Sequence, residues 1–455
     1  MKTIAALATP PGVSGIAVIR VSGPEVFSAI DKIFQGKQKP SEMKSHTIHY
    51  GDIIDIYNNN IIVDKAIISI FKAPNSFTGD DVIEISCHGG KITPSLILDL
   101  LYKMGISPAE PGEFTKMAFL NGKMDLVQAE AVADLIHSIS VNSSQTAARQ
   151  LNGNFSKSIS DLRQQLIKIC SLLEIDLDFI NDDVEFSDYD RMNALINDTI
   201  LFCENLINQY KADNILRSGF HIAIIGYPNS GKSSLFNALL NKNRAIVSNI
   251  PGTTRDYIED YIYVNNIPVK LIDTAGLRDT IDIIELDGIK LAENMVSQAD
   301  LILLINDLTL GENHSNKLFE YISNKFKEIP IVILQNKIDI ATTNDNNDLE
   351  QYTDNNIYIS AKKSIGLHDI SNIIVKYYNL SINPSQNILV NERHKALLIN
   401  VIEELSLAKN ALKTHSNELA AINIRNAANY FGEISGESFN NDVLNSIFSK
   451  FCIGK

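Results

Sequence analysis

The segment GYPNSGKS occupies residues 226–233 and follows the pattern G-x-x-x-x-G-K-[ST] of a phosphate-binding loop. An apolar run at residues 220–225 precedes it and predicts a buried strand, and residues 234–240 after it favour a helix. The motif needs this strand–loop–helix order, because its glycines turn backbone N–H groups toward phosphate oxygens and the helix N-terminus adds positive potential. We expect Lys232 to reach the β- and γ-phosphates of a nucleotide and Ser233 to ligate Mg²⁺.

Two later motifs indicate that the base of this nucleotide is guanine. The residues DTAG at 273–276 end an apolar run, so that Asp273 can hold Mg²⁺ and the glycine N–H can sense the γ-phosphate. The residues NKID at 336–339 end another apolar run, and the Asp339 carboxylate can accept two hydrogen bonds from guanine donors that adenine lacks. The residues SAK at 360–362 can supply a backbone N–H to the guanine O6. The order of these motifs predicts a translation-factor-like or Ras-like GTPase domain.

A further loop between these motifs carries PGTTRD at residues 251–256. A threonine in such a loop closes over Mg²⁺ and the γ-phosphate, and we assign Thr254 as the second Mg²⁺ ligand. Ras-like proteins orient the attacking water with a glutamine just after the Asp-x-x-Gly motif, but this chain has Leu277 there, which cannot hydrogen-bond water. Either an external protein completes the site or the water is oriented by a nearby polar residue, the candidates being Arg278, Asp279, Asp282 and Glu285.

Length and composition limit the class of protein. The chain has 455 residues, which is enough for about three domains, and its apolar content is that of a soluble globular protein. Its net charge of −14 argues against a protein that coats nucleic acid. The four cysteines form no C-x-x-C pairs, which argues against a zinc site or disulfide framework and fits a reducing cytoplasm. No apolar run reaches membrane-spanning length, and the short apolar N-terminus predicts a first β-strand rather than a signal peptide.

Changes in sequence pattern divide the chain into four segments. Residues 1–118 alternate short β-like runs with turns and a helical stretch, which predicts an α+β domain. Residues 119–217 and 381–455 carry apolar residues at three- and four-residue spacing, which predicts amphipathic helices. Since neither helical segment can bury its apolar stripe alone, we expect the two to form one all-α domain. The α/β P-loop GTPase domain, residues 218–380, is therefore predicted to be inserted into that helical domain.

Segments outside the GTPase motifs resemble the MnmE family of tRNA-modifying GTPases, also called TrmE. The sequence ATPPG stands at residues 8–12, and APNSFTGDD stands at residues 73–81. The sequences PGEF and FLNGKMDL follow at residues 111–114 and 119–126. The terminal pentapeptide FCIGK, residues 451–455, is highly diagnostic at the end of such a chain. The resemblance therefore covers essentially the whole sequence.

The resemblance implies a function for the N-terminal domain. In the family this domain resembles folate-dependent aminomethyl transferases, dimerises and binds a 5-formyltetrahydrofolate-type folate. Carried over residue by residue, the expected folate contacts are Arg20, Glu84, Lys123 and Lys455. A carboxylate such as Glu84 suits the guanine-like edge of a pterin, and basic side chains suit the glutamate tail of the folate. Without the family resemblance, an ordinary surface charge is the favoured interpretation of each of these residues.

The resemblance also implies that potassium takes the place of an arginine finger. Asn229 matches the potassium-ligating asparagine of the family, and Ser248, Ile250 and Thr253 would complete the cation site. A monovalent cation there can offset charge that develops between the β- and γ-phosphates. Glu285 aligns with the family's glutamate that orients the catalytic water indirectly.

Together these expectations define the candidate site residues. Cys452 is interpreted as a reactive thiol, with a buried small hydrophobic residue as the alternative. Catalytic roles are assigned to Glu285, Lys232 and Cys452. The expected GTP-binding residues are Asn229, Ser230, Gly231, Lys232, Ser233, Ser234, Ser248, Asn249, Ile250, Pro251, Gly252, Thr253, Thr254, Asp273, Thr274, Ala275, Gly276, Asn336, Lys337, Ile338, Asp339, Ser360, Ala361 and Lys362.

The resemblance implies a cytoplasmic homodimer that works with an FAD-dependent partner, MnmG in this family, in a heterotetramer or larger complex. The pair would add an aminomethyl or carboxymethylaminomethyl group at C5 of the wobble uridine, position 34, of certain tRNAs, with one carbon from folate. One alternative is a regulatory ribosome-assembly GTPase without group-transfer chemistry, although the termini lack the Lys- and Arg-rich appendage expected of it. A second alternative is a folate-dependent transferase whose GTPase is merely regulatory.

Overall fold

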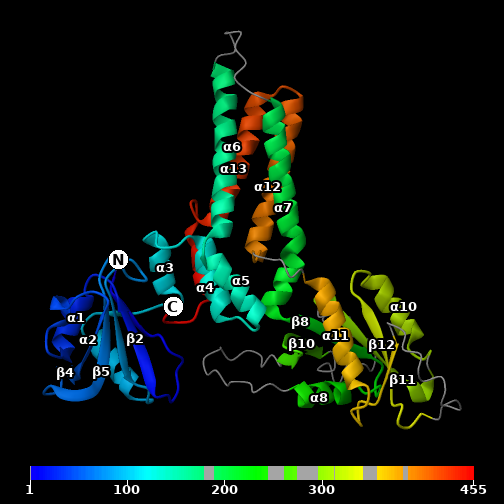
Figure 1. Ribbon diagram of the computed structural model, residues 1–455, viewed down its shortest axis with the longest axis horizontal. Coiled ribbons are helices and arrows are strands. Elements are labelled where there is room, and N and C mark those ends of the chain that lie inside the picture. The colour runs from blue at the N-terminus through cyan, green and yellow to red at the C-terminus, as the bar shows by residue number, and fades with distance from the viewer. Residues whose placement is uncertain are drawn as a thin grey trace.

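The computed structural model describes residues 2–178, 189–243, 261–273, 296–311, 313–341, 356–382 and 388–455. A β-rich N-terminal domain lies on one side of a long helical stalk, and an α/β domain lies on the other side (Figure 1). The stalk contains helices from before and after the α/β domain in the sequence. The multidomain fold class predicted from the sequence, with one domain inserted into a helical domain, is therefore confirmed.

The N-terminal domain is built on a seven-stranded sheet in the order β3-β4-β5-β6-β2-β1-β7. Helices α1 (Val26–Ile33) and α2 (Thr93–Lys103) contribute to one core with the sheet, and the short helices η1 (Pro40–Glu42) and α3 (Glu113–Leu120) follow in the same region. The strands are β1 (Ile4–Leu7), β2 (Ile16–Ser22), β3 (Phe34–Gln35), β4 (Thr47–Asp55), β5 (Ile61–Phe71), β6 (Val82–His88) and β7 (Ser107–Pro108). The predicted first β-strand is β1.

The burial pattern along β2 and β6 shows which side chains face the core and which lie on the opposite face of the sheet, where a ligand could bind. Ile19 and Ile85 point into the core shared with α1 and α2 and are fully buried. Because side chains alternate between the two faces of a strand, Arg20 and Glu84 lie on the opposite face. These two residues are paired directly in the antiparallel register of β2 and β6.

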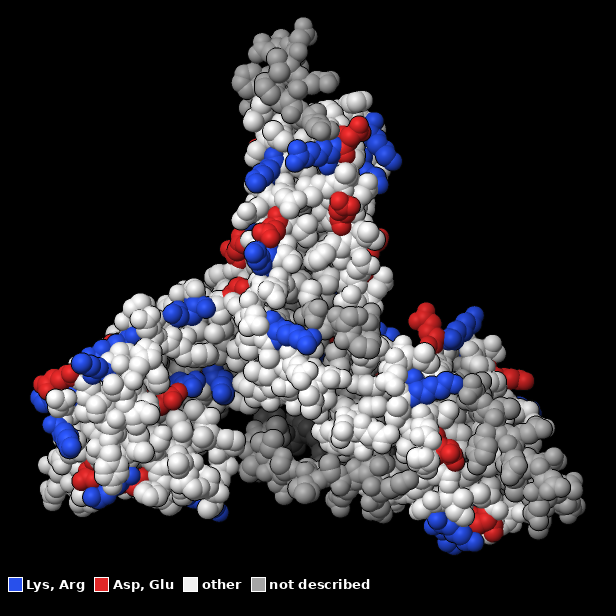
Figure 2. Space-filling view, viewed as in Figure 1, with Lys and Arg blue, Asp and Glu red and all other residues white. Residues whose placement is uncertain are grey.

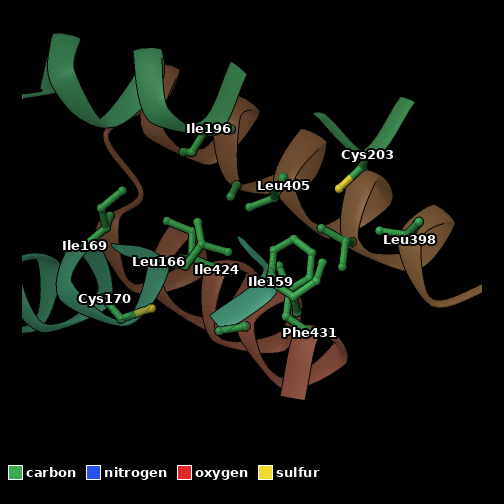
Figure 3. Close-up of a cluster of buried hydrophobic side chains, with 14 of the residues drawn as sticks. Ile159, Leu166, Ile169, Cys170, Ile196, Cys203, Leu398, Leu405, Ile424 and Phe431 are labelled. Atoms are coloured by element: carbon green, nitrogen blue, oxygen red, sulfur yellow. The ribbon is translucent and has the colours of Figure 1, made fainter. Parts of the chain in front are cut away.

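Helices α6 (Asn154–Asp178), α7 (Tyr189–Ser218), α12 (Glu392–Lys413) and α13 (Asn417–Ser435) form the stalk around a single apolar core (Figure 3). Leu166 on α6, Leu405 on α12 and Ile424 on α13 are fully buried in it. Burial of each such side chain stabilises the bundle by about 1.5–3 kcal/mol. The predicted pairing of the helical segments that flank the inserted domain is confirmed. Of the helices described, none combines the length and apolar character needed to cross a membrane.

Shorter helices at the base of the stalk begin with defined caps. They are α4 (Leu126–Ile136), α5 (Val141–Leu151) and α14 (Asn441–Phe448). Asp125 caps the N-terminus of α4 and Ser140 that of α5, each with a reciprocal capping box, and Asn391 caps α12 in the same way. Such caps satisfy backbone N–H groups that have no partner inside the helix, and each contributes about 1 kcal/mol.

The inserted domain has a six-stranded sheet in the order β13-β12-β11-β8-β10-β9. All neighbouring strands are parallel except β9, which runs antiparallel to β10. Every residue of β11 is buried, as expected of a central parallel strand covered on both faces. The elements are β8 (Phe220–Gly226), α8 (Lys232–Asn243), β9 (Tyr261–Val264), β10 (Ile267–Asp273), β11 (Leu301–Asp307), η3 (Leu308–Leu310), α10 (Asn316–Lys325), β12 (Ile331–Asn336), β13 (Asn356–Ile359) and α11 (Leu367–Ser381).

The chain leaves and re-enters the helical domain at one place. Arg217, at the end of α7, donates to the Asp134 carboxylate of α4 at 2.8 Å and to the Val390 carbonyl at 2.7 Å. The Leu389 N–H donates to the side-chain oxygen of Gln150 on α5 at 2.8 Å. Side chains from α4, α5 and α7 therefore hold the returning segment beside the departing one.

A second carboxylate on α4 joins that helix to α12 and α13. Glu130 accepts two hydrogen bonds from the Arg393 guanidinium, at 2.9 and 3.0 Å, and lies 2.7 Å from Nε2 of the fully buried His394. Arg393 also donates to the carbonyl of Glu433 on α13. Burial opposes ionisation of Glu130, but His394 and Arg393 outweigh it and hold the pKa of this carboxyl well below its usual range. Burial also lowers the pKa of His394, so its ring is neutral at pH 7.

We predict that Glu130→Gln destabilises the helical domain by about 3–5 kcal/mol at pH 7, because Arg393 loses its ionised partner in a buried site. The contribution of Glu130 is complete above its usual pKa of 4.5 and is lost as the pH falls toward its lower folded-state pKa. The difference between variant and wild type should therefore shrink below pH 4.5. Urea unfolding followed by circular dichroism measures it, with the exposed Glu403→Gln as control. Equal stability of the two variants at pH 7 would contradict the prediction.

Candidate functional site

The phosphate-binding loop links the end of β8 to the start of α8. Asn229 and Gly231 have left-handed backbone φ values of +61° and +105°. A Cβ atom on Gly231 would lie 2.2 Å from Nδ2 of Asn336, and one on Gly226 would lie 2.6 Å from the Ile305 carbonyl. Glycine is therefore favoured at both positions, by the close approach of the Asn336 side chain to Gly231 and of the β11 backbone to Gly226.

Polar groups of the loop converge on its interior. The Lys232 ammonium donates to the carbonyls of Gly226 and Tyr227 at 2.9 and 3.0 Å, so that it lies across the loop. Ser233 follows in the first turn of α8, where backbone N–H groups have no helical partner. Ser230 is buried, and no described group hydrogen-bonds to its hydroxyl. Such a loop fits a polyphosphate, which would supply acceptors for these donors.

Asn336 fixes the loop relative to the expected guanine-binding segments. Its amide Nδ2 donates to the Ser230 carbonyl at 2.8 Å, and its Oδ1 accepts from the Ala361 N–H at 3.0 Å. The side chain is buried, so both hydrogen bonds are shielded from water. One amide therefore sets the separation between the phosphate-binding loop and residues 360–362.

The expected guanine-binding carboxylate is held in place by its neighbours. Oδ1 of Asp339 accepts from the Ser360 hydroxyl at 2.8 Å, and Oδ2 lies 3.8 Å from the Lys363 ammonium. The hydrogen bond from Ser360 is the main reason that the pKa of Asp339 is lowered. The carboxylate is therefore ionised at neutral pH and can act as an acceptor. The Ile338 N–H donates to the Ile359 carbonyl, which joins the two segments through their backbones.

Sequence reasoning missed two residues of this site. Asp307 forms an ion pair with Lys337, whose backbone φ is +73°. Lys363 lies beside Asp339, as described above. The position of Asp307 at the end of the wholly apolar run 301–305 was a usable signal, since polar residues at the carboxyl ends of parallel strands face ligand sites. Lys363 had no such signal, because it stands in a polar loop.

The remaining expected residues divide into two groups. Ser234 lies on α8 and Lys362 is exposed. Asp273 ends β10, but only its backbone is described. The expected residues that lie outside the described ranges are Ser248, Asn249, Ile250, Pro251, Gly252, Thr253, Thr254, Thr274, Ala275, Gly276 and Glu285.

A second polar site lies on the N-terminal sheet. Arg20 donates to the Glu84 carboxylate at 2.8 and 2.9 Å and to the Gly454 carbonyl at 3.4 Å. The guanidinium carbon also lies 5.3 Å from the ring centre of Phe77 and 5.7 Å from that of Phe114. Arg20 therefore joins β2, β6, the 73–81 loop, α3 and the C-terminal tail.

The C-terminal tail, residues 449–455, is bound to the N-terminal domain. The Phe114 N–H donates to the Lys455 carbonyl at 3.2 Å, and the Gly112 N–H donates to the Cys452 carbonyl at 3.4 Å. Gly454 has φ of +93°, and a Cβ there would lie 2.4 Å from the Leu7 carbonyl. The tail is thus held against β1 and α3 through its backbone.

The four residues expected to bind folate lie around this junction. Arg20 and Glu84 are in direct contact, and the backbone of Lys455 is one residue from the Arg20 contact. Lys123 is placed separately, with its ammonium donating to the Pro74 carbonyl at 3.0 Å in the 73–81 loop. Cys452 is exposed, so the alternative of a buried small hydrophobic residue is wrong.

Comparison with known proteins assigns the chain to a family. Residues 126–452 match the family model of the MnmE helical domain, and residues 3–123 match that of the GTP-binding protein TrmE N-terminus. The tRNA modification GTPase MnmE of Christiangramia forsetii is 40% identical over 472 aligned residues, covering 100% of this chain and 99% of that protein. The MnmE of Flavobacterium johnsoniae is 41% identical over 464 aligned residues, with coverage of 100% and 99%.

A solved structure of a GTP-binding protein from Sulfolobus solfataricus in complex with GDP is 22% identical over 52% of this chain and 72% of that one. The TM-score between the two structures is 0.26. The two family models and the full-length relatives are decisive: the chain belongs to the MnmE family of tRNA modification GTPases.

Proposed function

We propose that this chain hydrolyses GTP in the course of modifying C5 of the wobble uridine, position 34, of certain tRNAs. It acts with the FAD-dependent partner MnmG and adds an aminomethyl or carboxymethylaminomethyl group, with one carbon from a 5-formyltetrahydrofolate-type folate. The observation that carries the proposal is that one chain contains two preorganised polar sites, the phosphate-binding loop and the Arg20–Glu84 pair. A regulatory ribosome-assembly GTPase would need only the first.

In the GTP site each described residue has a proposed role. Lys232 contacts the β- and γ-phosphates, Asp339 selects guanine, and Asn336 positions the loop that carries Ser230. Ser233, in the first turn of α8, would hold Mg²⁺ together with Thr254. The bound Mg²⁺ neutralises charge on the phosphate oxygens.

Two roles fall mainly on residues outside the described ranges, and they rest on the family resemblance. Glu285 is proposed to orient the catalytic water, since Leu277 cannot do so. Asn229 is proposed to ligate K⁺ together with Ser248, Ile250 and Thr253. Of these ligands Asn229 is described, and its left-handed backbone lies within the phosphate-binding loop.

The Arg20–Glu84 site fits a folate in its chemistry. The Glu84 carboxylate keeps acceptor capacity beyond its pairing with Arg20, and the Phe77 and Phe114 rings offer apolar surface beside it. We place the folate's glutamate tail near the ammonium groups of Lys123 and Lys455. Cys452 is proposed as a reactive thiol of the same site, because it is exposed two residues before Gly454.

We propose a cytoplasmic homodimer whose domains are residues 1–118, the split helical domain 119–217 and 381–455, and the GTPase domain 218–380. Exposed apolar side chains on the N-terminal sheet support the dimer: Ile48, Tyr50 and Ile67 are 71%, 63% and 41% exposed. On the face shown in Figure 2, basic and acidic side chains of the described residues are interspersed over all three domains. We propose that tRNA handling is shared with MnmG, in a heterotetramer or larger complex.

The function predicts a specific loss of a tRNA nucleoside. A strain that lacks the gene should lose the modified uridine at position 34, and a plasmid copy of the wild-type gene should restore it. Arg20→Ala should not restore it, because Glu84 and the Gly454 carbonyl lose their shared partner. Mass spectrometry of tRNA nucleosides measures this, with the exposed Lys44→Ala as control. Normal modification in the deletion strain would overturn the proposed function.

Guanine recognition predicts a change of base preference. Asp339→Asn should weaken GTP binding and favour xanthosine triphosphate, because asparagine presents a donor where the aspartate presents an acceptor. Each mismatched polar group costs about 1–3 kcal/mol. Ser360→Ala is the matched control, since it removes the hydroxyl bound to Asp339 but keeps the carboxylate. Competition binding should show altered preference only for Asp339→Asn, and unchanged preference in that variant would refute the assignment.

The proposed cation site predicts that GTP hydrolysis is at least about tenfold faster in KCl than in NaCl of equal ionic strength. The reason is that an ion in the position of an arginine finger substitutes for a group that contributes about 10³–10⁵ to the rate. Asn229→Ala should remove most of this difference, whereas Asn237→Ala, exposed on α8, should not. Steady-state turnover measures both effects. Equal rates in both salts would exclude the potassium site and leave Arg278 or Arg255 as the candidate electrophile.

A further inference from the structure

The hairpin formed by β9 and β10 is attached to the base of the helical domain. The Tyr263 hydroxyl donates to the Ile139 carbonyl at 3.1 Å, and the Tyr261 hydroxyl donates to the Ser218 carbonyl at 3.1 Å. Ile139 lies between α4 and α5, and Ser218 is the last residue of α7. The two tyrosines thus connect the GTPase-domain sheet to three helices of the other domain.

Close packing accompanies these hydrogen bonds. Gly219 joins α7 to β8 with φ of +81°. A Cβ added to it would lie 3.0 Å from the Pro268 carbonyl, 3.0 Å from the Tyr261 ring and 3.5 Å from Cδ1 of Ile139. No space therefore remains at Gly219, where the β9–β10 hairpin packs against the α7–β8 connection and the α4–α5 link. A displacement of the hairpin must move Ile139 or break the contact.

The hairpin also stands between two nucleotide-sensing motifs in the sequence. β9 begins five residues after the PGTTRD segment that ends at Asp256, and β10 ends at Asp273 of the DTAG segment. Both segments are expected to change with the γ-phosphate. The hairpin is thus the part of the sheet that is covalently closest to both.

The opposite end of α4 contacts the anchor of the C-terminal tail. Leu126 and Ala129 of α4 share a buried cluster with Phe448, which precedes the tail, and with Phe451 inside it. Three residues later, the Gly454 carbonyl accepts from Arg20. Helix α4 and the three residues that follow it therefore connect the hairpin contact at Ile139 to the support of the second site.

We propose that Tyr263, acting through Ile139 and α4, couples the nucleotide state of the GTPase domain to ligand affinity at the Arg20–Glu84 site. The identities of the two ligands rest on the proposed function. Tyr263 contacts neither ligand site and is a positioning residue. Because such coupling is an equilibrium property, each ligand must change the affinity of the other by the same factor.

The test uses the full chain and measures the dissociation constant of 5-formyltetrahydrofolate in KCl and MgCl₂. One series contains GDP, and the other contains a non-hydrolysable GTP analogue. In the wild type the two constants should differ by about fivefold or more, the lower end of typical coupling between sites. Tyr263→Phe should reduce this ratio by about twofold or more, the lower limit expected for loss of one hydrogen bond. Tyr263→Ala, which also removes the ring, should reduce it further.

A role of Tyr263 in stability alone would not change this ratio. Nucleotide affinity without folate and the unfolding temperature should stay near wild type in Tyr263→Phe. Tyr321→Phe, exposed on α10, is the matched control and should keep the wild-type ratio. The reciprocal titration, with nucleotide added in the presence and absence of folate, must give the same ratio.

Two kinds of result would contradict the proposal, and the experiment separates them. If folate binds and the ratio is one in the wild type, or is the same in wild type and both Tyr263 variants, the coupling route is wrong while the proposed function stands. If folate binds in neither nucleotide state, the proposed folate site is wrong, and the inference falls with it.

Discussion

The architecture depends on one constraint: the chain must leave the helical domain for the inserted domain and return from it at the same place. α6 and α7 precede the GTPase domain and α12 and α13 follow it, so the stalk core forms only when the chain returns to its starting point. Two carboxylates on α4 act at this point. Asp134 binds Arg217 where the chain leaves, and Glu130 binds Arg393 shortly after it returns.

The apolar core and this charged network make different contributions. Each buried leucine or isoleucine of the stalk contributes about 1.5–3 kcal/mol, and many such residues lie in that core. A buried ion pair gains little over apolar side chains of the same volume, because desolvation offsets its attraction. Asp213 illustrates this cost: burial raises its pKa to about 7, although it accepts a hydrogen bond from the Val390 N–H. The core therefore supplies most of the stability, and the network fixes where the returning chain must lie.

The parts of the fold that were predictable are those with a local or periodic signal. The phosphate-binding loop is contiguous, and the stripes on α6 and α12 repeat at helical spacing, so the sequence alone predicts both. The contact of Glu130 with Arg393 joins positions 263 residues apart and has no period, so the sequence pattern contained no sign of it. The backbone attachment of the tail to Gly112 and Phe114 was equally hidden, because it uses no distinctive side chain. For the N-terminal site, resemblance supplied residues that spacing could not.

The same geometry limits how GTP hydrolysis can influence chemistry elsewhere. The phosphate-binding loop and the Arg20–Glu84 pair lie in domains on opposite sides of the stalk (Figure 1), so neither ligand can act directly on the other's residues within one chain. A signal along the chain must cross the base of the helical domain. α4 has eleven residues and is about 16 Å long, too short to bend appreciably. Because Glu130 and Asp134 stand four residues apart on one face of this helix, a displacement of α4 must carry or break both ion pairs, with Arg393 and with Arg217.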